Sequence, residues 1–531
     1  MSKKASAKKK EERTGEQIAK GLTGGISKIT SCYVILMFAV FPLFITDKYY
    51  NCLKDKYYFF FYATAAITAI VLFLYLAGIA MGAFKGVGVR KVFGRLTLTD
   101  KFMMAFLVVC GLSTCLSEWK YESFWGNMGR LQGMFFFILI TLGYFVVTRA
   151  YRFNKKHLYI LLAAGIVVSL WGVIDYLGVD PLCWREDAGD YWGMLIFTST
   201  IGNVNTFTAI VALYFGMSAF LSCKLEKPWF ALASFSVSTM AMAAGQSDNA
   251  VLSVGITMAV LPFLLSENRK GVIRYLVLVV VFFASLWVIG LVTASWTATE
   301  VLPEVMWGVL LTISNKYTKY CLIIAAAFAG IALLLWLIRK NDISKKVKGL
   351  RVFWGIICTA VLAAVIYAFV DANSGRHAEF WKPYENILVF NDSWGTFRGY
   401  AWRNTFEFFK DFSIFKKLIG SGPETYAIFM AENCYYEMIE RSGTVFDSPH
   451  SEPIQMLFTT GLFGFISYYG VFVTAVIRGL KKNTWSRACA VAVTAYLFAS
   501  VINISVPLTT PLFFLLMELS LIIGEKDEET P

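Results

Sequence analysis

Three side chains in one polar stretch, residues 371–450, have the chemistry of a group-transfer site. Arg398 and Arg403 stand five residues apart, and His450 closes the stretch between two prolines. The planar fork of an arginine binds phosphate oxygens in pairs and keeps its charge. An imidazole titrates near neutral pH and can take a proton from a hydroxyl group. The stretch therefore predicts a site that holds a large anion and activates a hydroxyl nucleophile.

The arginine segment has helical character, and five residues on a helix turn Arg398 and Arg403 about 140° apart, with Trp402 beside the second. The two arginines would then grip different oxygens of one anion, or different ligands. Two alternatives remain open: these are ordinary surface arginines, and His450 is a structural histidine. With an unperturbed imidazole pKa near 6.5, a histidine base predicts a rate that falls as the pH drops through that value. Glu452 is the rival base.

Three more candidate substrate-binding residues lie at the expected outer ends of membrane helices: Arg130, Asn203 and Gln246. An arginine at that depth either reaches for lipid headgroups or meets an anion. Buried amides most often join helices, but they can also line a sugar-binding cavity. The sequence leaves both interpretations open for each of these residues.

Residues 420–424, Gly-Ser-Gly-Pro-Glu, are typical of a turn that enters a helix, with Ser421 and Glu424 as a capping box. A helix start of this kind can also bind an anion. The outer segments contain no DxD-type metal pair, and a solvated loop explains the acidic cluster of Glu186, Asp187 and Asp190 as well as a metal site does. We expect no metal and no cofactor.

The composition shows what must position these residues. The chain has 531 residues, of which 57% are hydrophobic and only 16% are charged, which excludes an ordinary soluble enzyme. Apolar runs long enough to span a bilayer recur along almost the whole length. The net charge of +13 is spread in short clusters between these runs, where it sets topology and does not indicate nucleic acid. The fold class is therefore an all-α polytopic membrane protein.

The hydrophobic pattern predicts about fourteen transmembrane helices and one large extracytoplasmic loop. We expect a disordered cytoplasmic basic tail over 1–29 that touches anionic lipid, helices within 30–370, a catalytic loop over 371–452, helices within 453–524, and a cytoplasmic tail over 525–531. The expected helices lie near 30–46, 58–82, 102–117, 131–148, 157–178, 203–222, 229–244, 250–265, 272–294, 319–338, 352–370, 454–477, 485–503 and 508–524.

The distribution of basic residues orients this pattern. With both termini cytoplasmic, the inner segments hold 33 of the 49 Lys and Arg residues, as the positive-inside rule requires. The 371–450 stretch then faces outward. Two further outer segments are long, 179–201 and 295–319. The second includes Val305–Ile313, which is too short to span and is typical of an interfacial or re-entrant helix.

Several short motifs occur in a fixed order along the membrane helices. They are Gly129-Arg130-Leu131-Gln132-Gly133, Gly202-Asn203-Val204-Asn205, Gly245-Gln246-Ser247, Arg398 through Trp402, Gly420-Ser421-Gly422-Pro423, and Pro449-His450-Ser451 followed by Gly461-Leu462-Phe463-Gly464. In these motifs the chain resembles the O-antigen ligase and polymerase family of bacterial envelope proteins over roughly residues 120–475. It departs from the family where many members have His-Asn in place of His450-Ser451, and Ser-Arg in place of Ser247-Asp248.

The resemblance implies an integral membrane glycosyltransferase of the bacterial cytoplasmic membrane, with the active site outside. The donor would be a glycan on undecaprenyl diphosphate, and the acceptor a sugar hydroxyl on another glycan or a glycolipid. His450 would be the base, Arg398 and Arg403 would hold the diphosphate, and displacement would invert the anomeric carbon without nucleotide or metal. Ligation to another acceptor remains open, and so does a lipid-linked oligosaccharide flippase or polysaccharide exporter. A flippase predicts charges in the middle of the membrane helices, whereas here the charge gathers in one outer loop.

Overall fold

The computed structural model describes residues 2–83, 95–126, 129–184, 198–266, 268–296, 308–338, 347–443 and 445–524. Within these ranges the chain is helical, and the only β-type pairing is an isolated bridge between Thr198 and Gly202. This confirms the all-α class. Outside the described residues lie the acidic cluster at 186–190, most of the 179–201 segment, residues 297–307, the basic loop 339–346 and the tail 525–531.

The first half of the chain folds into helices that are mostly long and apolar. Their bounds are α1 (Ser2–Ala39), η1 (Phe41–Leu43), α2 (Cys52–Ala80), α4 (Leu98–Leu116), α5 (Lys120–Trp125), α6 (Met134–Ala150), α7 (Lys155–Tyr176), α9 (Val204–Lys224), α10 (Trp229–Ala244), α11 (Asn249–Leu265) and α12 (Arg269–Trp296).

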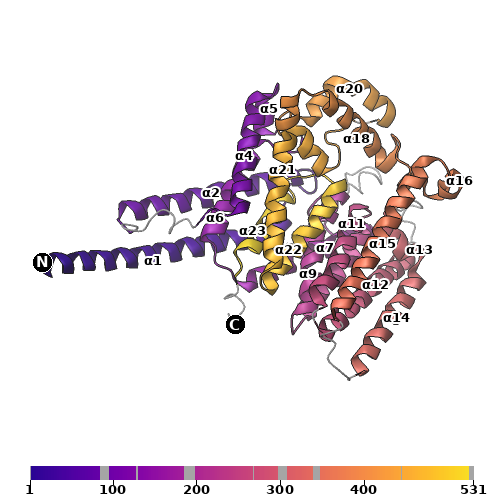
Figure 1. Ribbon diagram of the computed structural model, residues 1–531, viewed down its shortest axis with the longest axis horizontal. Coiled ribbons are helices and arrows are strands. Elements are labelled where there is room, and N and C mark those ends of the chain that lie inside the picture. Colours follow the sequence, from indigo (N-terminus) through magenta and orange to yellow (C-terminus); the bar gives the residue numbers. More distant parts are fainter. Residues whose placement is uncertain are drawn as a thin grey trace.

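The N-terminal tail differs from its prediction. Helix α1 begins at Ser2 and continues without a break into the first apolar run, so the disorder predicted for residues 1–29 is wrong. Alanine, lysine and glutamate, which dominate the first twenty residues, are all strong helix formers. An adjoining helix also removes the cost of nucleation. In Figure 1, α1 and its neighbour α2 run together away from the main body.

The second half contains the remaining membrane helices and the polar stretch between them. Their bounds are α13 (Val309–Lys316), α14 (Thr318–Leu337), α15 (Val347–Ser374), α16 (Ala378–Trp381), η4 (Lys382–Tyr384), α17 (Glu385–Leu388), α18 (Trp394–Asp411), α19 (Ile414–Ile419), α20 (Tyr426–Ser442), α21 (Glu452–Leu480), α22 (Thr484–Ala499), η5 (Ser500–Ile502) and α23 (Thr510–Ile522). The short α13 overlaps the interfacial helix that the sequence predicts over 305–313.

Every predicted membrane range overlaps one of these helices. Within the described residues, ten helices are long and apolar enough to cross a membrane, and four shorter apolar helices accompany them: α6, α10, α11 and α23. The multi-pass architecture is therefore confirmed. The total of fourteen spans stays a prediction.

Helix α9 is the centre of the bundle, because its whole apolar window is buried. It contacts α7, α10, α11 and α22. Two glycines of α7 make room for its rings: a Cβ on Gly165 would lie 2.6 Å from Tyr214, and one on Gly172 would lie 2.1 Å from Phe207. The two contacts are seven residues apart in each helix, so α7 and α9 pack closely along one line of contact.

The polar stretch forms a helical segment with its own apolar core, and we call residues 371–450 the polar segment. Buried rings and methionines of α18 and α20 pack around Phe458 of α21. Figure 1 shows α18 and α20 together beyond the end of α21, next to α5. The segment therefore has a fixed shape against the membrane helices.

Helix α21 is broken at Gly461, whose φ of 64° and ψ of −173° are outside the helical region. The break exposes the carbonyl groups of Phe458 and Thr459, and these accept the N–H groups of Ser421 and Gly422 at 3.2 and 2.9 Å. A Cβ on Gly461 would lie 2.4 Å from the backbone of the polar segment, so only glycine allows this contact. Such broken helices occur where irregular backbone lines a site.

Candidate active site

His450 lies directly before α21, in the left-handed conformation with φ of 50°. Its N–H donates to Ser448 Oγ at 3.2 Å, and the indole of Trp402 donates to the carbonyl oxygen of Pro449 at 2.7 Å. The ring of Phe446 meets the imidazole edge-on, with centroids 6.4 Å apart. The backbone around His450 is thus held on both sides.

The imidazole nitrogens of His450 have no hydrogen-bond partner among the described residues. The other two histidines differ in this respect. His157 bonds to the hydroxyl of Tyr151 at 2.8 Å, and His377 bonds to Asp371 at 2.8 Å. His450 is the histidine whose lone pair is available to a substrate.

Arg130 reaches the same place from the turn between α5 and α6. Its Nη2 forms an ion pair with Asp447, three residues before His450. Its Nε is buried and has no partner. The side chain is only 11% exposed. This guanidinium is largely buried and uses only some of its N–H donors, so the others remain available to a bound anion.

The turn that carries Arg130 is held by Glu424. The carboxylate accepts the N–H groups of Arg130 at 2.7 Å and Gln132 at 3.3 Å. The predicted capping box of Ser421 and Glu424 is therefore wrong: α20 begins after Thr425, and Glu424 points across to another helix pair. Burial raises the pKa of Glu424 to about 8, and the charge of Arg130 opposes this shift.

Arg398 follows three consecutive left-handed residues, 395–397, that turn the chain before the regular part of α18. Its Nη1 donates to the carbonyl oxygen of Gly395 at 2.8 Å, and its Nε is buried without a partner. Burial lowers the pKa of Arg398, while the charge of Asp248 raises it. Asp248 at the start of α11 thus lies within electrostatic reach of Arg398.

The two arginines act on His450. Burial, together with the charges of Arg130 and Arg398, lowers the pKa of His450 to about 3, and the charge of Asp447 opposes this shift. The value near 6.5 applies to an unperturbed imidazole, and the pKa of His450 in the protein without substrate lies below it. The structure brings His450, Arg130 and Arg398 within electrostatic reach of one another, although 320 residues separate the first pair in the sequence.

Arg403 has a different environment. Its Nε and Nη2 donate to the two oxygens of Asp392 at 2.9 and 3.0 Å. Arg441 donates to the same carboxylate at 2.8 Å, and both arginines lie over the ring of Tyr400. Arg403 thus lies on a different side of α18 from Arg398, and its fork is already occupied. Its role in diphosphate binding stays a prediction.

A small polar cavity adjoins His450. It is lined by Arg130, Gln132, Glu424, Ser448, Ser451, Gln455, Ile504 and Ser505.

Oε1 of Gln455, which lines this cavity, is buried without a hydrogen-bond partner, and so is Oε2 of Glu452, a residue that does not line it. Glu452 is 1% exposed, and its other oxygen accepts the hydroxyl of Tyr468. Unfilled polar positions of this type suit a ligand with several hydroxyl groups.

Asn203 and Gln246 lie at the ends of α9 and α10, and neither lines the polar cavity. Asn203 caps α9, and its side chain accepts the N–H of Asn205 at 2.8 Å. Asn205 in turn accepts Ser247 Oγ at 2.6 Å, and its carbonyl accepts Asn503 Nδ2 at 2.8 Å. These contacts join α9, α11 and the chain before α23. Sugar binding by Asn203 and Gln246 stays a prediction.

Asp447 and Glu424 are site residues that the sequence does not predict. Both are acidic residues near glycine or proline, a pattern typical of turns, and their partner Arg130 is about 300 residues away. Only the order of motifs, which places residues 129–133 and 420–424 at the same membrane face, could have suggested the pairing.

Comparison with known proteins gives one match to a protein-family model. A search of the curated proteins found no match. A protein-family model described as O-Antigen ligase matches residues 305–469, less than a third of the chain, from just before α13 to the middle of α21. The matched part includes Arg398, Arg403, His450 and Glu452, whereas Arg130 comes from outside it. The multi-pass helices and this match together support a membrane glycan ligase or polymerase of the bacterial inner membrane. The match confirms the resemblance of the chain to the O-antigen ligase and polymerase family.

Proposed function

We propose that this protein transfers a glycan from undecaprenyl diphosphate to a sugar hydroxyl at the outer face of the cytoplasmic membrane. The proposal rests on three side chains. The ring nitrogens of His450 have no hydrogen bond among the described residues, and Arg130 and Arg398 each have a buried N–H without a partner. A diphosphate is the large anion that two such guanidinium groups suit.

The reaction is a single displacement. The acceptor oxygen forms a bond to the anomeric carbon, the bond from that carbon to the phosphate oxygen breaks, and its electron pair leaves with undecaprenyl diphosphate. The acceptor proton passes to a ring nitrogen of His450. Attack opposite to the leaving group inverts the anomeric carbon. Arg130 and Arg398 stabilise the charge that develops on the leaving diphosphate, so we propose a transfer that is independent of metal.

The electrostatics of His450 suit an ordered reaction. In the empty site the two arginines help to hold its pKa near 3, which makes it a weak base. A bound diphosphate offsets those two charges and moves the pKa back toward its ordinary value. We therefore propose that donor binding strengthens the base before the acceptor loses its proton.

The first half of α21 supports donor binding in a second way. Residues 452–460 form a half-helix whose N-terminus begins beside His450, and the free N–H groups of a helix start favour an anion. The polar cavity next to it has a volume of about 10 Å³, too small for a sugar ring, but its unpartnered Gln455 Oε1 suits a single hydroxyl group of an acceptor sugar. Whether that acceptor belongs to a growing polymer or to another glycolipid depends on contacts beyond this cavity.

The proposal is tested with purified protein, a lipid-linked glycan donor and a glycan acceptor, by following the joined product. We expect His450→Ala to lose on the order of 10²–10⁴-fold in rate while donor binding persists. His377→Ala is the matched control, because that histidine is 60% exposed and paired with Asp371 at the surface. Normal turnover by His450→Ala would remove the histidine from the mechanism. A protein that moves the donor across vesicles without joining glycans would favour the flippase alternative.

A further inference from the structure

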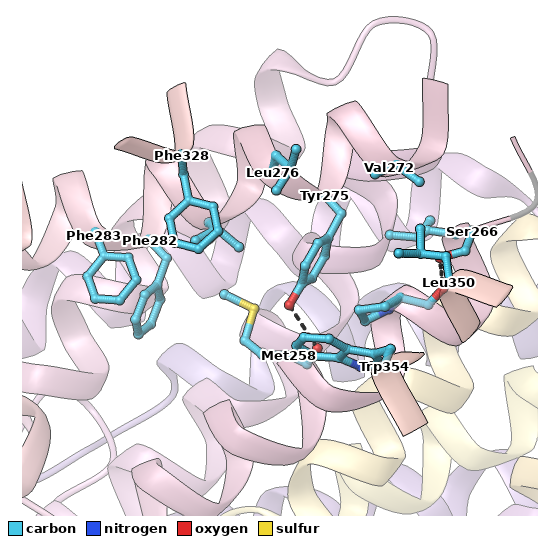
Figure 2. A pocket seen from close by; sticks show the side chains of 13 residues that line it. Met258, Ser266, Val272, Tyr275, Leu276, Phe282, Phe283, Phe328, Leu350 and Trp354 are labelled. Carbon is cyan, nitrogen blue, oxygen red and sulfur yellow. Dashed lines mark hydrogen bonds between the residues drawn. The ribbon is translucent and has the colours of Figure 1, made fainter. Parts of the chain in front are cut away.

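An apolar cavity of about 380 Å³ lies between α11, α12, α14 and α15, remote from His450. Figure 2 shows Phe282, Phe283 and Phe328 at one end of it, and Val272 and Leu350 toward the other. The cavity adjoins the end of α11 at Leu265, whereas the opposite end of α11 carries Asp248 near Arg398. It is therefore separate from the candidate active site.

The walls of this cavity suit hydrocarbon. Tyr275 and Trp354 line it with rings 6.2 Å apart, and their polar atoms are already bonded to the backbone of α11. The hydroxyl of Tyr275 donates to Met258 O at 3.1 Å, and the indole of Trp354 donates to Ala259 O at 2.9 Å. None of the residues in the apolar window of α15 is fully buried, so this side of the cavity faces the surface of the helix bundle.

Two arginines mark the Val272 and Leu350 end. Arg269 precedes Val272 by one helical turn, and Arg351 follows Leu350 directly. Nη2 of Arg269 and Nε of Arg351 are buried, and neither guanidinium has a hydrogen bond or ion pair among the described residues.

Helices α12 and α15 both begin at the Val272 and Leu350 end of the cavity. A rise of 1.5 Å per residue therefore places Arg269 roughly 9 Å, and Arg351 roughly 5 Å, before the Tyr275–Trp354 contact. Unmet positive charge thus adjoins an apolar cavity that opens to the bilayer.

We propose that this is a binding site for an anionic glycerophospholipid, with its phosphate on Arg269 and Arg351 and one acyl chain in the cavity. Basic pockets between membrane helices attract anionic headgroups in this way. The proposal does not rest on the glycosyltransferase function. The isoprenoid chain of a donor fits less well, because a diphosphate held by Arg130 and Arg398 lies at the other end of the bundle.

The test is native mass spectrometry of the full-length protein with phosphatidylglycerol or phosphatidylcholine of identical acyl chains. Two basic residues predict roughly 30-fold tighter retention of phosphatidylglycerol. The double variant Arg269→Gln and Arg351→Gln should abolish this preference. Its matched control is Arg152→Gln with Lys481→Gln, which removes two exposed charges from loops predicted at the same membrane face and should leave the preference intact.

A second variant separates the acyl chain from the headgroup. Leu276→Trp extends into the cavity and should reduce retention of both lipids without touching either arginine. Equal retention of the two lipids by the wild-type protein overturns the proposal, as does a double variant that behaves like its control. Displacement of phosphatidylglycerol by equimolar undecaprenyl phosphate overturns the choice of occupant, because it would assign the cavity to an isoprenoid. Should the double variant fail to fold, the wild-type comparison and Leu276→Trp still decide the outcome.

Discussion

The indole nitrogen of Trp402 donates a hydrogen bond to the carbonyl oxygen of Pro449 at 2.7 Å. Helix α18 is thereby attached to the residue directly before His450. The same helix carries Arg398 one turn earlier. A single short connection therefore sets the position of the proposed base relative to one of the proposed diphosphate ligands.

Trp402→Phe should keep the ring in place but remove this hydrogen bond. We expect kcat to fall about 2- to 10-fold, the range that corresponds to one hydrogen bond, with the KM for the donor almost unchanged. Steady-state kinetics measure both constants. Trp381→Phe is the control, because its indole bonds to Asp371 at the far end of the polar segment. Equal losses in the two variants would mean that Trp402 acts only on stability.

The pH dependence should differ between the free enzyme and the donor complex. Because the folded-state pKa of His450 is lowered to about 3, the imidazole stays neutral above about pH 4. We expect kcat/KM, which reports the free enzyme, to stay flat from pH 8 down through 6.5. In contrast, kcat reports the complex and should show an inflection at higher pH than kcat/KM, since the diphosphate offsets the arginine charges. An inflection of kcat/KM near 6.5 would contradict this electrostatic account.

The folding stability should respond to the same group with a defined sign. A histidine with a lowered folded-state pKa binds a proton more weakly when folded than when unfolded. The free energy of unfolding is therefore unaffected by this group above the unfolded-state pKa of about 6.5. It decreases as the pH falls from there toward 3, because the unfolded state then binds a proton that the folded state does not. Thermal unfolding in detergent at pH 7 and pH 5 should show this decline, and His450→Gln should reduce it.

The two arginines of α18 should behave differently on substitution. Arg398→Ala should weaken donor binding on the order of tenfold to a hundredfold, and Arg398→Lys should restore only part of it because lysine lacks the fork. Arg403→Gln should instead act through Asp392. Binding of labelled donor to the purified variants measures both effects.

A double-mutant cycle decides the role of Arg403. If it acts through Asp392 alone, Asp392→Asn, Arg403→Gln and the double variant should lose similar amounts of activity. If Arg403 grips the donor directly, Arg403→Gln should lose much more donor affinity than Asp392→Asn. The second outcome would restore the arrangement that the sequence predicts.

Glu452 is the rival base, and its placement argues against that role. The residue is 1% exposed, and one of its oxygens is taken by Tyr468. We expect Glu452→Gln to keep activity within about tenfold of wild type, compared with the 10²–10⁴-fold loss in His450→Ala. Single-turnover transfer assays compare the two variants. An inactive Glu452→Gln beside an active His450→Ala would move the base two residues along the chain.

The predicted orientation can be tested by cysteine labelling in intact cells. The exposed native cysteines Cys32, Cys115 and Cys183 are first replaced by serine. A membrane-impermeant thiol reagent should then modify Tyr436→Cys, a position that is 86% exposed in the polar segment, but not Lys481→Cys between α21 and α22. Both should react after permeabilisation. The reverse pattern would place the polar segment in the cytoplasm.

The helices could be predicted from the sequence because each depends on an uninterrupted apolar run. His450 and Arg398 were proposed as site residues from their place in the polar segment and from the family resemblance, and their catalytic roles stay predictions. The break in α21 could not be predicted in this way. It depends on the approach of the chain at Gly420 to Gly461, and only three-dimensional packing brings those two glycines together.

From the sequence, anion binding by Arg130 could be proposed only as an alternative to lipid anchoring. Its role depends on Asp447 and Glu424, which are distant in the sequence and have no local signature of a site. Arg403 is the opposite case, a predicted ligand that the structure shows to be already paired. Its residue type suggested an anion ligand, but Asp392 stands eleven residues earlier and already fills its fork. Residue type predicts what a side chain can bind, whereas its neighbours determine what remains free to bind.

The close approach of Gly420 and Gly461 has a consequence for how such an enzyme can diversify. The contact attaches the polar segment to α21 through backbone groups, so this attachment does not depend on the exposed side chains of the segment. Much of α20, including Tyr435 and Tyr436, is exposed and can change without moving His450. The backbone contact and the Trp402 hydrogen bond hold the proposed base from inside the polar segment, so the exposed face of α20 is free to vary in sequence while that arrangement is kept.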